Sequence, residues 1–158
     1  MIVRRMRAHE TEAVAGLVRR VFDAHVAPLF APEGVATFAA YAAPDAYRER
    51  TRGDFITLVA EVRDGMCGML ELRHGDHVSL FFVETSWQGK GVGRALMREA
   101  VAVCRAFDPG LKAVTVNASP NAVAMYERMG FVATDEAQEM EGIVFTPMAL
   151  PLDAADAG

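Results

Sequence analysis

Cysteine is scarce in this 158-residue sequence, and long apolar runs are missing from it. Cys67 and Cys104 lie far apart and form no C-x-x-C pair, which excludes a disulfide framework. No apolar stretch approaches the ~20 residues that a membrane-spanning helix needs. Residues 1–7 carry arginines but no apolar segment typical of a signal peptide. We therefore expect a reduced, cytoplasmic protein without a membrane partner.

Basic residues are also in deficit. Lysine and arginine number 16 against 21 aspartate and glutamate residues, and the formal net charge is −5. Because binding to a phosphate backbone needs a basic surface, we expect no nucleic-acid partner. The histidines show neither H-E-x-x-H nor cysteine-rich spacing, so we expect no metal site; they are His9, His25, His74 and His77.

The chain length and the 52% hydrophobic content fit one folded domain, which we place at residues 1–150, followed by a short flexible tail at 151–158. The apolar spacing of Val14, Leu17, Val18 and Val21 predicts a helix. Prolines predict a loop at 27–34, and helical pieces follow up to residue 52. Strands are predicted at 2–6, 55–62, 66–73, 77–83, 112–116, 138–140 and 143–149, and later helices at 91–105 and 119–129. This order predicts an α/β domain with a mixed sheet.

A glycine-rich turn follows the strand predicted at 77–83 and leads into the helix predicted at 91–105. The amides of a helix N-terminus and its dipole favour an anion, and glycines let a pyrophosphate approach closely. A Walker A loop is excluded because Gly91 follows Lys90, and a dinucleotide fingerprint would need glycine at Arg94. The turn therefore predicts a phosphate-bearing ligand that is bound by neither of these two motifs. The alternative is a turn that only connects the strand to the helix. Its residues are Gln88, Gly89, Lys90, Gly91, Val92, Gly93 and Arg94.

This turn resembles the acetyl-CoA-binding motif Q/R-x-x-G-x-G/A of the GCN5-related N-acetyltransferases (GNAT). A second segment, residues 122–131, is similar to the A-x-x-x-Y-x-x-x-G-F helix end of the same family. The resemblance implies the GNAT fold, an α/β (α+β) arrangement. Its sheet is mixed but mostly antiparallel, with about seven strands flanked by about four helices. A splay between two parallel strands, here 78–83 and 112–116, would hold acyl-CoA, and the fold often forms a homodimer.

The resemblance also implies how acetyl-CoA would be bound as a co-substrate. Phe81, Phe82 and Val83 would carry the pantetheine, and a free amide near Phe82 or Val83 would polarise the thioester carbonyl. The turn from Gln88 to Arg94 would hold the pyrophosphate. Many relatives have asparagine where this chain has Ser119; the neighbouring Asn117 and Asn121 are therefore alternative sources of the polar contact.

The implied reaction is direct attack of a primary amine on the thioester in a ternary complex. Tyr126 holds the position of the family's general acid, and Glu71 is the candidate base, with bulk water as its competitor. The acceptor would be a small-molecule or peptide amine. Seven side chains would line its pocket or belong to the core: Phe22, His25, Phe30, Phe38, Tyr41, Tyr47 and Phe145. A non-catalytic acyl-CoA-binding or regulatory domain is the alternative function.

Overall fold

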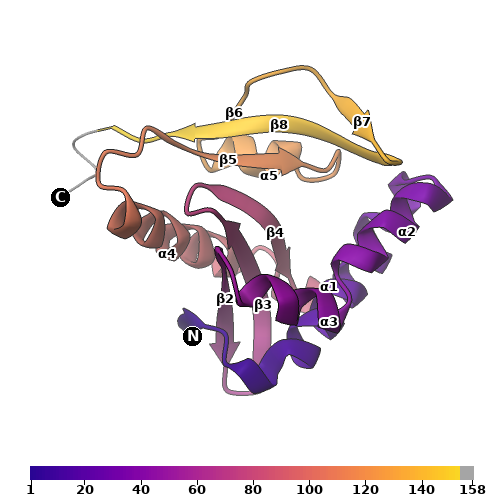
Figure 1. Ribbon diagram of the computed structural model, residues 1–158, viewed down its shortest axis with the longest axis horizontal. Helices are drawn as coiled ribbons and strands as arrows, with labels where there is room; N and C mark the ends of the chain where they lie inside the picture. Colours follow the sequence, from indigo (N-terminus) through magenta and orange to yellow (C-terminus); the bar gives the residue numbers. More distant parts are fainter. Residues whose placement is uncertain (154–158) are drawn as a thin grey trace.

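The computed structural model describes residues 1–153 and contains a mixed sheet with helices on both faces (Figure 1). The strands run in the order β1-β2-β3-β4-β5-β8-β6, and β7 pairs with β8. Every pair is antiparallel except β4 with β5. The strands are β1 (Ile2–Arg5), β2 (Phe55–Val62), β3 (Gly65–Arg73), β4 (His77–Val83), β5 (Ala113–Ala118), β6 (Val132–Ala133), β7 (Gln138–Met140) and β8 (Ile143–Pro151).

The helices cover the sheet from two sides. The apolar stripe of α1, which includes Val14, Leu17 and Val18, is buried on the face that Met69 and Leu80 also occupy. The apolar stripe of α4 is buried on the opposite face of the same strands. The sheet therefore has a core on each face. The helices are α1 (Thr11–His25), α2 (Pro32–Tyr41), α3 (Pro44–Thr51), α4 (Val92–Phe107) and α5 (Val123–Arg128).

The parallel pair β4–β5 opens into a splay, as the resemblance predicted. The two strands pair only at His77 with Thr115 and at Val78 with Val116. Beyond these pairs β4 remains bonded to β3, while β5 remains bonded to β8. Figure 1 shows the two halves of the sheet diverging from this point. The mixed sheet and its splay are thus confirmed; among the described residues the sheet has eight strands, because the two-residue β6 adds to the predicted set.

Two predicted elements differ from the structure. The helix predicted from residue 119 begins at Val123, because the Ser119 hydroxyl bonds Asn121 Oδ1 at 2.7 Å rather than capping the helix. The loop predicted at 27–34 contains a 3₁₀ turn, Ala27–Leu29, and the start of α2. Pro32 is tolerated there because the first residue of a helix needs no N–H partner.

The end of the sheet extends past the predicted domain boundary. Pro151 lies opposite Ala113 in the β5–β8 ladder. The Leu152 N–H donates to the Lys112 carbonyl at 2.9 Å. Pro151 and Leu152, the first two residues of the predicted tail, are therefore attached to the sheet. Residues 154–158 of the tail lie outside the described part of the chain.

Cys67 and Cys104 are buried, free thiols in the core between the sheet and α4. Burial raises the pKa of both, to about 11 for Cys104, so they act as small apolar side chains. Across residues 1–153, no three or more His, Cys, Asp or Glu side chains gather as a metal-ligand set. Nor does this part of the chain contain a helix with the length and apolar character required to cross a bilayer.

Candidate active site

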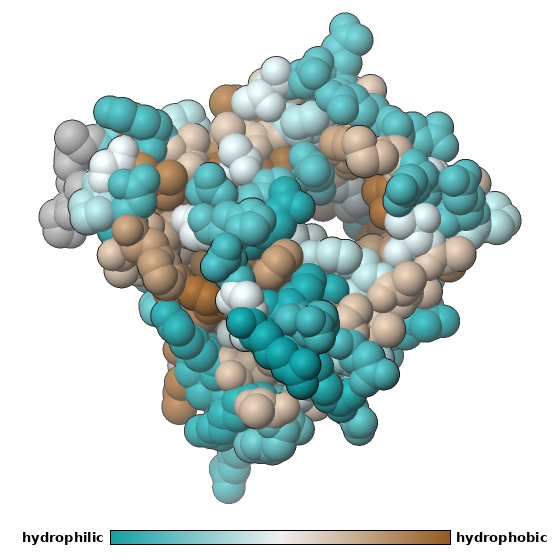
Figure 2. All heavy atoms as spheres, viewed as in Figure 1, coloured by the Kyte–Doolittle hydropathy of each residue, from teal (hydrophilic) through white to brown (hydrophobic). Residues whose placement is uncertain are grey.

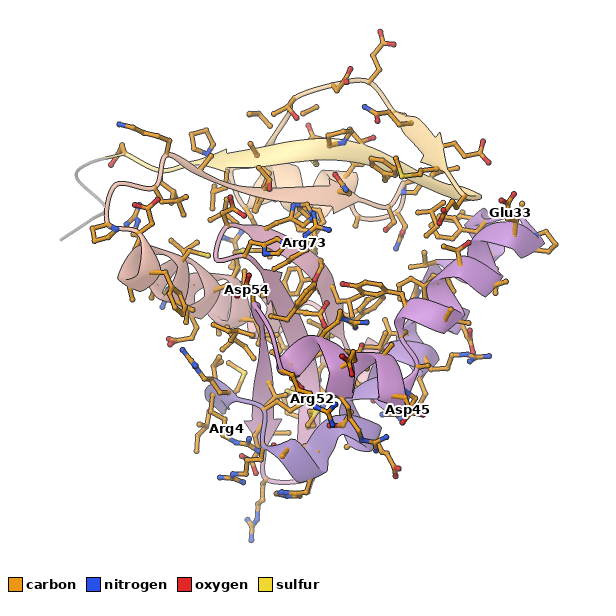
Figure 3. All side chains as sticks on the ribbon, viewed as in Figure 1. Arg4, Glu33, Asp45, Arg52, Asp54 and Arg73 are labelled. Carbon is orange, nitrogen blue, oxygen red and sulfur yellow. The ribbon has the colours of Figure 1, made fainter. Side chains whose placement is uncertain are left out.

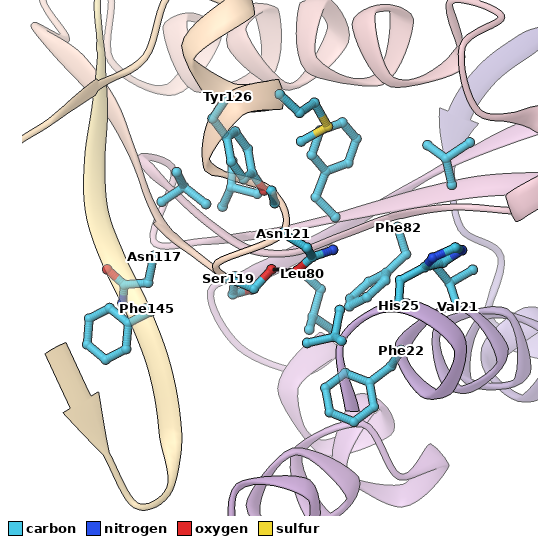
Figure 4. Close-up of a pocket in the computed structure, with 18 of the residues that line it drawn as sticks. Val21, Phe22, His25, Leu80, Phe82, Asn117, Ser119, Asn121, Tyr126 and Phe145 are labelled. Atoms are coloured by element: carbon cyan, nitrogen blue, oxygen red, sulfur yellow. Dashed lines mark hydrogen bonds between the residues drawn. The ribbon is translucent and has the colours of Figure 1, made fainter. Parts of the chain in front are cut away.

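A cleft of about 1120 Å³ occupies the splay between β4 and β5. One half of its wall comes from α1, α2 and the β7–β8 hairpin, and the other half comes from the glycine-rich turn and α5. Figure 2 shows the hollow between these parts, and Figure 4 shows side chains that line it. Pockets for one small ligand measure ~300–1,000 Å³. The cleft is therefore somewhat larger than a pocket for one small ligand.

A bulge in β4 lies at the point where the cleft begins. Glu71 of β3 lies opposite Leu80, but the next residue, Leu72, lies opposite Val78. Ser79 is left without a partner in the ladder. An extra residue reverses the alternation of backbone groups along a strand. The bulge thus changes which residues of β4 turn their amides toward the splay.

The backbone amides of Phe81 and Val83 face the splay. The Glu84 N–H donates to the Cys67 carbonyl of β3 at 2.8 Å. Because successive residues direct their backbone groups to opposite edges of a strand, Phe82 also faces β3, and the two residues beside it face away. The splay side of β4 therefore presents two amides. Of the two residues predicted to supply an amide, Val83 faces the cleft, whereas the amide of Phe82 belongs to the ladder with β3.

The glycine-rich turn presents unpaired amides to open space. Gly89 (φ 75°) and Gly91 (φ 87°) adopt the left-handed conformation that favours glycine. The first bond of α4 runs from the Ala95 N–H to the Gly91 carbonyl, so the amides of residues 92–94 have no partner within the helix. A Cβ added at Gly89 or Gly91 would contact nothing within 4 Å. This is the geometry of an anion-binding helix N-terminus.

Side chains of the turn have different roles. The Gln88 amide donates to the Val83 carbonyl at 3.0 Å and so ties the turn to β4. Arg94 lines the cleft, together with Gln88 and the glycines at 89, 91 and 93. In contrast, Lys90 lies 5.2 Å from the Trp87 ring centroid, and Val92 is buried in the core. Neither of these two side chains lines the cleft, so the predicted role of Lys90 and Val92 in binding depends on their backbone amides.

Tyr126 of α5 lies in the cleft wall between two aromatic rings. Its ring centroid is 6.0 Å from that of Phe81 and 5.2 Å from that of Phe131. The residue is only 5% exposed, and within residues 1–153 no side chain or backbone group bonds its hydroxyl. Burial raises the pKa of the phenol well above its ordinary value. The hydroxyl therefore keeps its proton at neutral pH.

Polar side chains at the end of β5 and just after it line the cleft at two places. Asn117 belongs to the β5–β8 ladder, opposite Pro147, and lies beside Phe145 in Figure 4. Ser119 and Asn121 are hydrogen-bonded to each other at the end of β5. All three line the cleft. Asn117 therefore lines a different part of the cleft from the Ser119–Asn121 pair.

Glu71 is fully buried beneath the cleft and does not line it. Its carboxylate accepts bonds from the hydroxyls of Tyr41 (2.7 Å) and Ser79 (2.6 Å). Arg50 adds two more, from Nε at 3.1 Å and from Nη2 at 3.0 Å. Four donors fill the lone pairs of a carboxylate. We call this group the Glu71 network. Because its carboxylate already accepts four hydrogen bonds, it has no free lone pair with which to take a proton from a substrate.

Aromatic rings form the wall of the cleft on the side of α1 and α2. Phe22 stacks on Phe38 with ring centroids 3.8 Å apart. Phe30 and Phe82 contact this pair edge-on, at 5.8 Å from Phe22 and 5.9 Å from Phe38 respectively. Of the seven side chains predicted for the acceptor pocket, Tyr47 alone lies outside the lining, because it is fully buried under α3.

A contact between α2 and the β7–β8 hairpin closes the rim of this half. A Cβ at Gly34 would collide with the carbonyl of Gly142, so the two backbones touch. The Thr37 hydroxyl lies 2.9 Å from the Glu141 carbonyl, to which it donates. We call this contact the rim latch. No local sequence pattern indicates this contact, because the two segments are far apart in the chain.

Comparison with known proteins agrees with this geometry. The protein-family model of the acetyltransferase (GNAT) domain matches residues 26–152 of this chain. A GCN5-related N-acetyltransferase structure from Rhodopseudomonas palustris has a TM-score of 0.82 at 22% identity, over 96% of this chain and 95% of that one. PaiA N-acetyltransferase from Thermoplasma acidophilum, solved with coenzyme A, has a TM-score of 0.77 at 15% identity, over 96% and 98%.

A third solved structure is a ribosomal-protein-alanine N-acetyltransferase from Brucella melitensis. It has a TM-score of 0.66 at 17% identity and covers 96% of this chain and 100% of that one. Identities this low show the shared fold alone. No curated protein sequence matches the chain. The domain match covers far more than half of the sequence, and the chain therefore belongs to the GNAT acetyltransferase family.

Proposed function

We propose that this protein is an N-acetyltransferase that transfers the acetyl group of acetyl-CoA to a primary amine. Family membership supports acyl transfer in general. One observation supports the finer proposal: a single cleft brings together the splay-facing amides of β4, the open glycine turn and the phenol of Tyr126. The relative solved with coenzyme A supports the choice of donor.

The donor would lie along β4 from the glycine turn into the splay. The amides of residues 92–94 and the left-handed glycines would hold the pyrophosphate. The amides of Phe81 and Val83 are the candidates for hydrogen bonds to the pantetheine and to the thioester oxygen. Such a donor stabilises the negative charge that develops on this oxygen during attack.

The reaction needs one proton removed and one proton supplied. An alkylammonium has a pKa near ~10.4 and must be deprotonated before its nitrogen attacks the carbonyl carbon. The new C–N bond forms as the C–S bond breaks. Tyr126 would donate its proton to the departing thiolate and regain one from solvent. Its raised pKa suits this role, because the phenol is protonated at the pH of the reaction.

The base is assigned to water rather than to Glu71. The carboxylate of Glu71 already accepts four hydrogen bonds and has no exposed surface. We therefore propose that Glu71 positions Tyr41 and α3, while the proton of the amine passes to water in the cleft. This proposal keeps Glu71 in the site but changes its role from base to support.

Titration with acetyl-CoA by calorimetry tests the donor site. Arg94→Glu places a negative charge in the cleft beside the glycine turn, whereas Arg98→Glu makes the same change one turn further along α4, outside this cleft. We expect binding to the wild type and to Arg98→Glu, and weaker binding to Arg94→Glu. A wild type that binds no acetyl-CoA contradicts the proposal.

Turnover is then measured with a panel of amines by detecting the released thiol. Acetylation of any amine supports the transferase. If acetyl-CoA binds but no amine is acetylated, the protein is instead a non-catalytic acyl-CoA-binding domain. The binding and turnover experiments together therefore separate the two candidate functions.

A further inference from the structure

Arg73 brings a positive charge to the lining of the cleft. It ends β3, where it lies opposite His77 of β4 and Phe55 of β2. Because side chains alternate along a strand, Arg73 shares the α1–α3 face of the sheet with Glu71. It lines the cleft and lies near the centre of Figure 3, close to the point where β4 and β5 part.

The guanidinium of Arg73 lacks a partner in the described part of the chain. No carboxylate in residues 1–153 forms an ion pair with it, and its Nε is buried without a hydrogen bond. Arg50, on the same face, differs because Glu71 neutralises it at 3.0 Å. A buried donor without an acceptor is costly. The position of Arg73 in a cleft wall therefore suits an acceptor group that a ligand supplies.

Among the described residues, no carboxylate of the cleft lining pairs with Arg73, and Asp76, whose charge acts on the neighbouring His77, does not belong to that lining. Of the described residues that line the cleft, Glu141 at the hairpin tip is the sole carboxylate, and its backbone carbonyl forms the rim latch. His77 carries no charge at neutral pH, because burial and then Arg73 lower its pKa to about 4. Its Nδ1 lies 2.8 Å from the Thr115 hydroxyl. Arg73 thus brings an unpaired positive charge to the cleft, although the chain as a whole is acidic.

We propose that Arg73 binds a carboxylate of the acceptor, so that the substrate is an amine that carries a carboxylate, such as a free amino acid. This inference rests on the proposed N-acetyltransferase function. An amine without an anionic group would meet an uncompensated guanidinium as it entered. A carboxylate matches the planar fork of arginine and can form two parallel hydrogen bonds with it. The ring wall of Phe22 and Phe38 would contact the apolar part of the substrate.

Matched pairs of acceptors test the proposal by kinetics. Each pair shares a side chain and differs in the carboxylate: phenylalanine with phenethylamine, leucine with isoamylamine, and alanine with ethylamine. We expect the wild type to favour the amino acid in kcat/KM by about 10- to 100-fold in at least one pair. Arg73→Gln should abolish this preference, and Arg73→Lys should restore part of it. Arg52→Gln, at an exposed residue outside the cleft, should keep it.

A binding measurement separates this proposal from the proposed function. Phenylalanine, leucine and alanine are titrated by calorimetry into the wild type and Arg73→Gln, each with and without coenzyme A. We expect binding to the wild type and a loss of about 10- to 100-fold in Arg73→Gln, with the same melting temperature for both free proteins. Equal affinity of the two proteins, or no amino-acid binding by the wild type, overturns the role of Arg73. Failure to bind acetyl-CoA would overturn the transferase instead.

Discussion

The phenol of Tyr126 gives a prediction at the scale of one residue. Tyr126→Phe removes the proton donor but keeps the ring between Phe81 and Phe131, so kcat should fall by about 100-fold while acetyl-CoA affinity is unchanged. Tyr47→Phe removes a buried hydroxyl outside the cleft and should leave kcat unchanged. Steady-state kinetics and calorimetry check both variants. Undiminished turnover in Tyr126→Phe would remove its role as the acid.

His77 gives a prediction about stability and pH. Its pKa in the folded protein is about 4, below the ordinary value of 6.5, so the unfolded chain binds more protons between these values. Stability should therefore fall as the pH falls from 6.5 to 4. His77→Gln should reduce this dependence, and His9→Gln, at an exposed residue outside the cleft, should retain it. Urea unfolding at pH 7 and at pH 4.5 measures the difference; an equal loss in all three proteins contradicts the assignment.

At the scale of elements, the Glu71 network fixes α2 and α3 on the sheet. Tyr41 ends α2 and Arg50 belongs to α3, and both bond the carboxylate on β3. Glu71→Ala should destabilise the fold by about 3–5 kcal/mol, because it removes the carboxylate that neutralises the largely buried guanidinium of Arg50. Glu49→Ala breaks an exposed pair with Arg52 and should cost less than about 1 kcal/mol. Urea unfolding compares the two; similar losses would show that the network is not a structural support.

Elements with a local signal could be predicted from the sequence. The meander β2–β3–β4 follows from its β-forming residues and from the Asp64-Gly65 turn, and the start of α4 follows from its glycines. The start of α5 could not be predicted, because the Ser119 hydroxyl bonds a side chain instead of the helix end. β6 has two residues and is too short for periodicity to reveal it.

The site was only partly predictable for a similar reason. The glycine turn and Tyr126 lie in motifs of fixed spacing, and the structure places both at the cleft. Arg50 and Glu71 are 21 residues apart, so no local pattern relates them, and only the folded chain shows that the carboxylate is occupied. Arg73 was missed because only the folded chain shows that no carboxylate in residues 1–153 forms an ion pair with its guanidinium.

At the scale of the whole molecule, the rim latch joins parts of the chain that are far apart in sequence. A side chain at Gly34 must push α2 away from Gly142, whereas a Cβ at Gly53 would meet nothing closer than 3.7 Å. Gly34→Ala should lower kcat/KM for the acceptor by about 10- to 100-fold, because small displacements of a substrate wall are costly. Gly53→Ala should have no such effect. Unchanged acceptor kinetics in Gly34→Ala would show that the latch does not shape the site.

The rim latch also limits the routes by which a substrate could enter the cleft. Since α2 meets the hairpin, the wall of the cleft is continuous at this contact and gives no way in there. In the proposed reaction the donor would enter beside the glycine turn, and the acceptor would enter from the opposite end of the cleft. A lysine in the middle of a folded surface would have to avoid the rim latch while its neighbours stayed attached on both sides. We therefore expect the cleft to accept amines of free molecules and of chain ends in preference to lysines in the interior of a polypeptide.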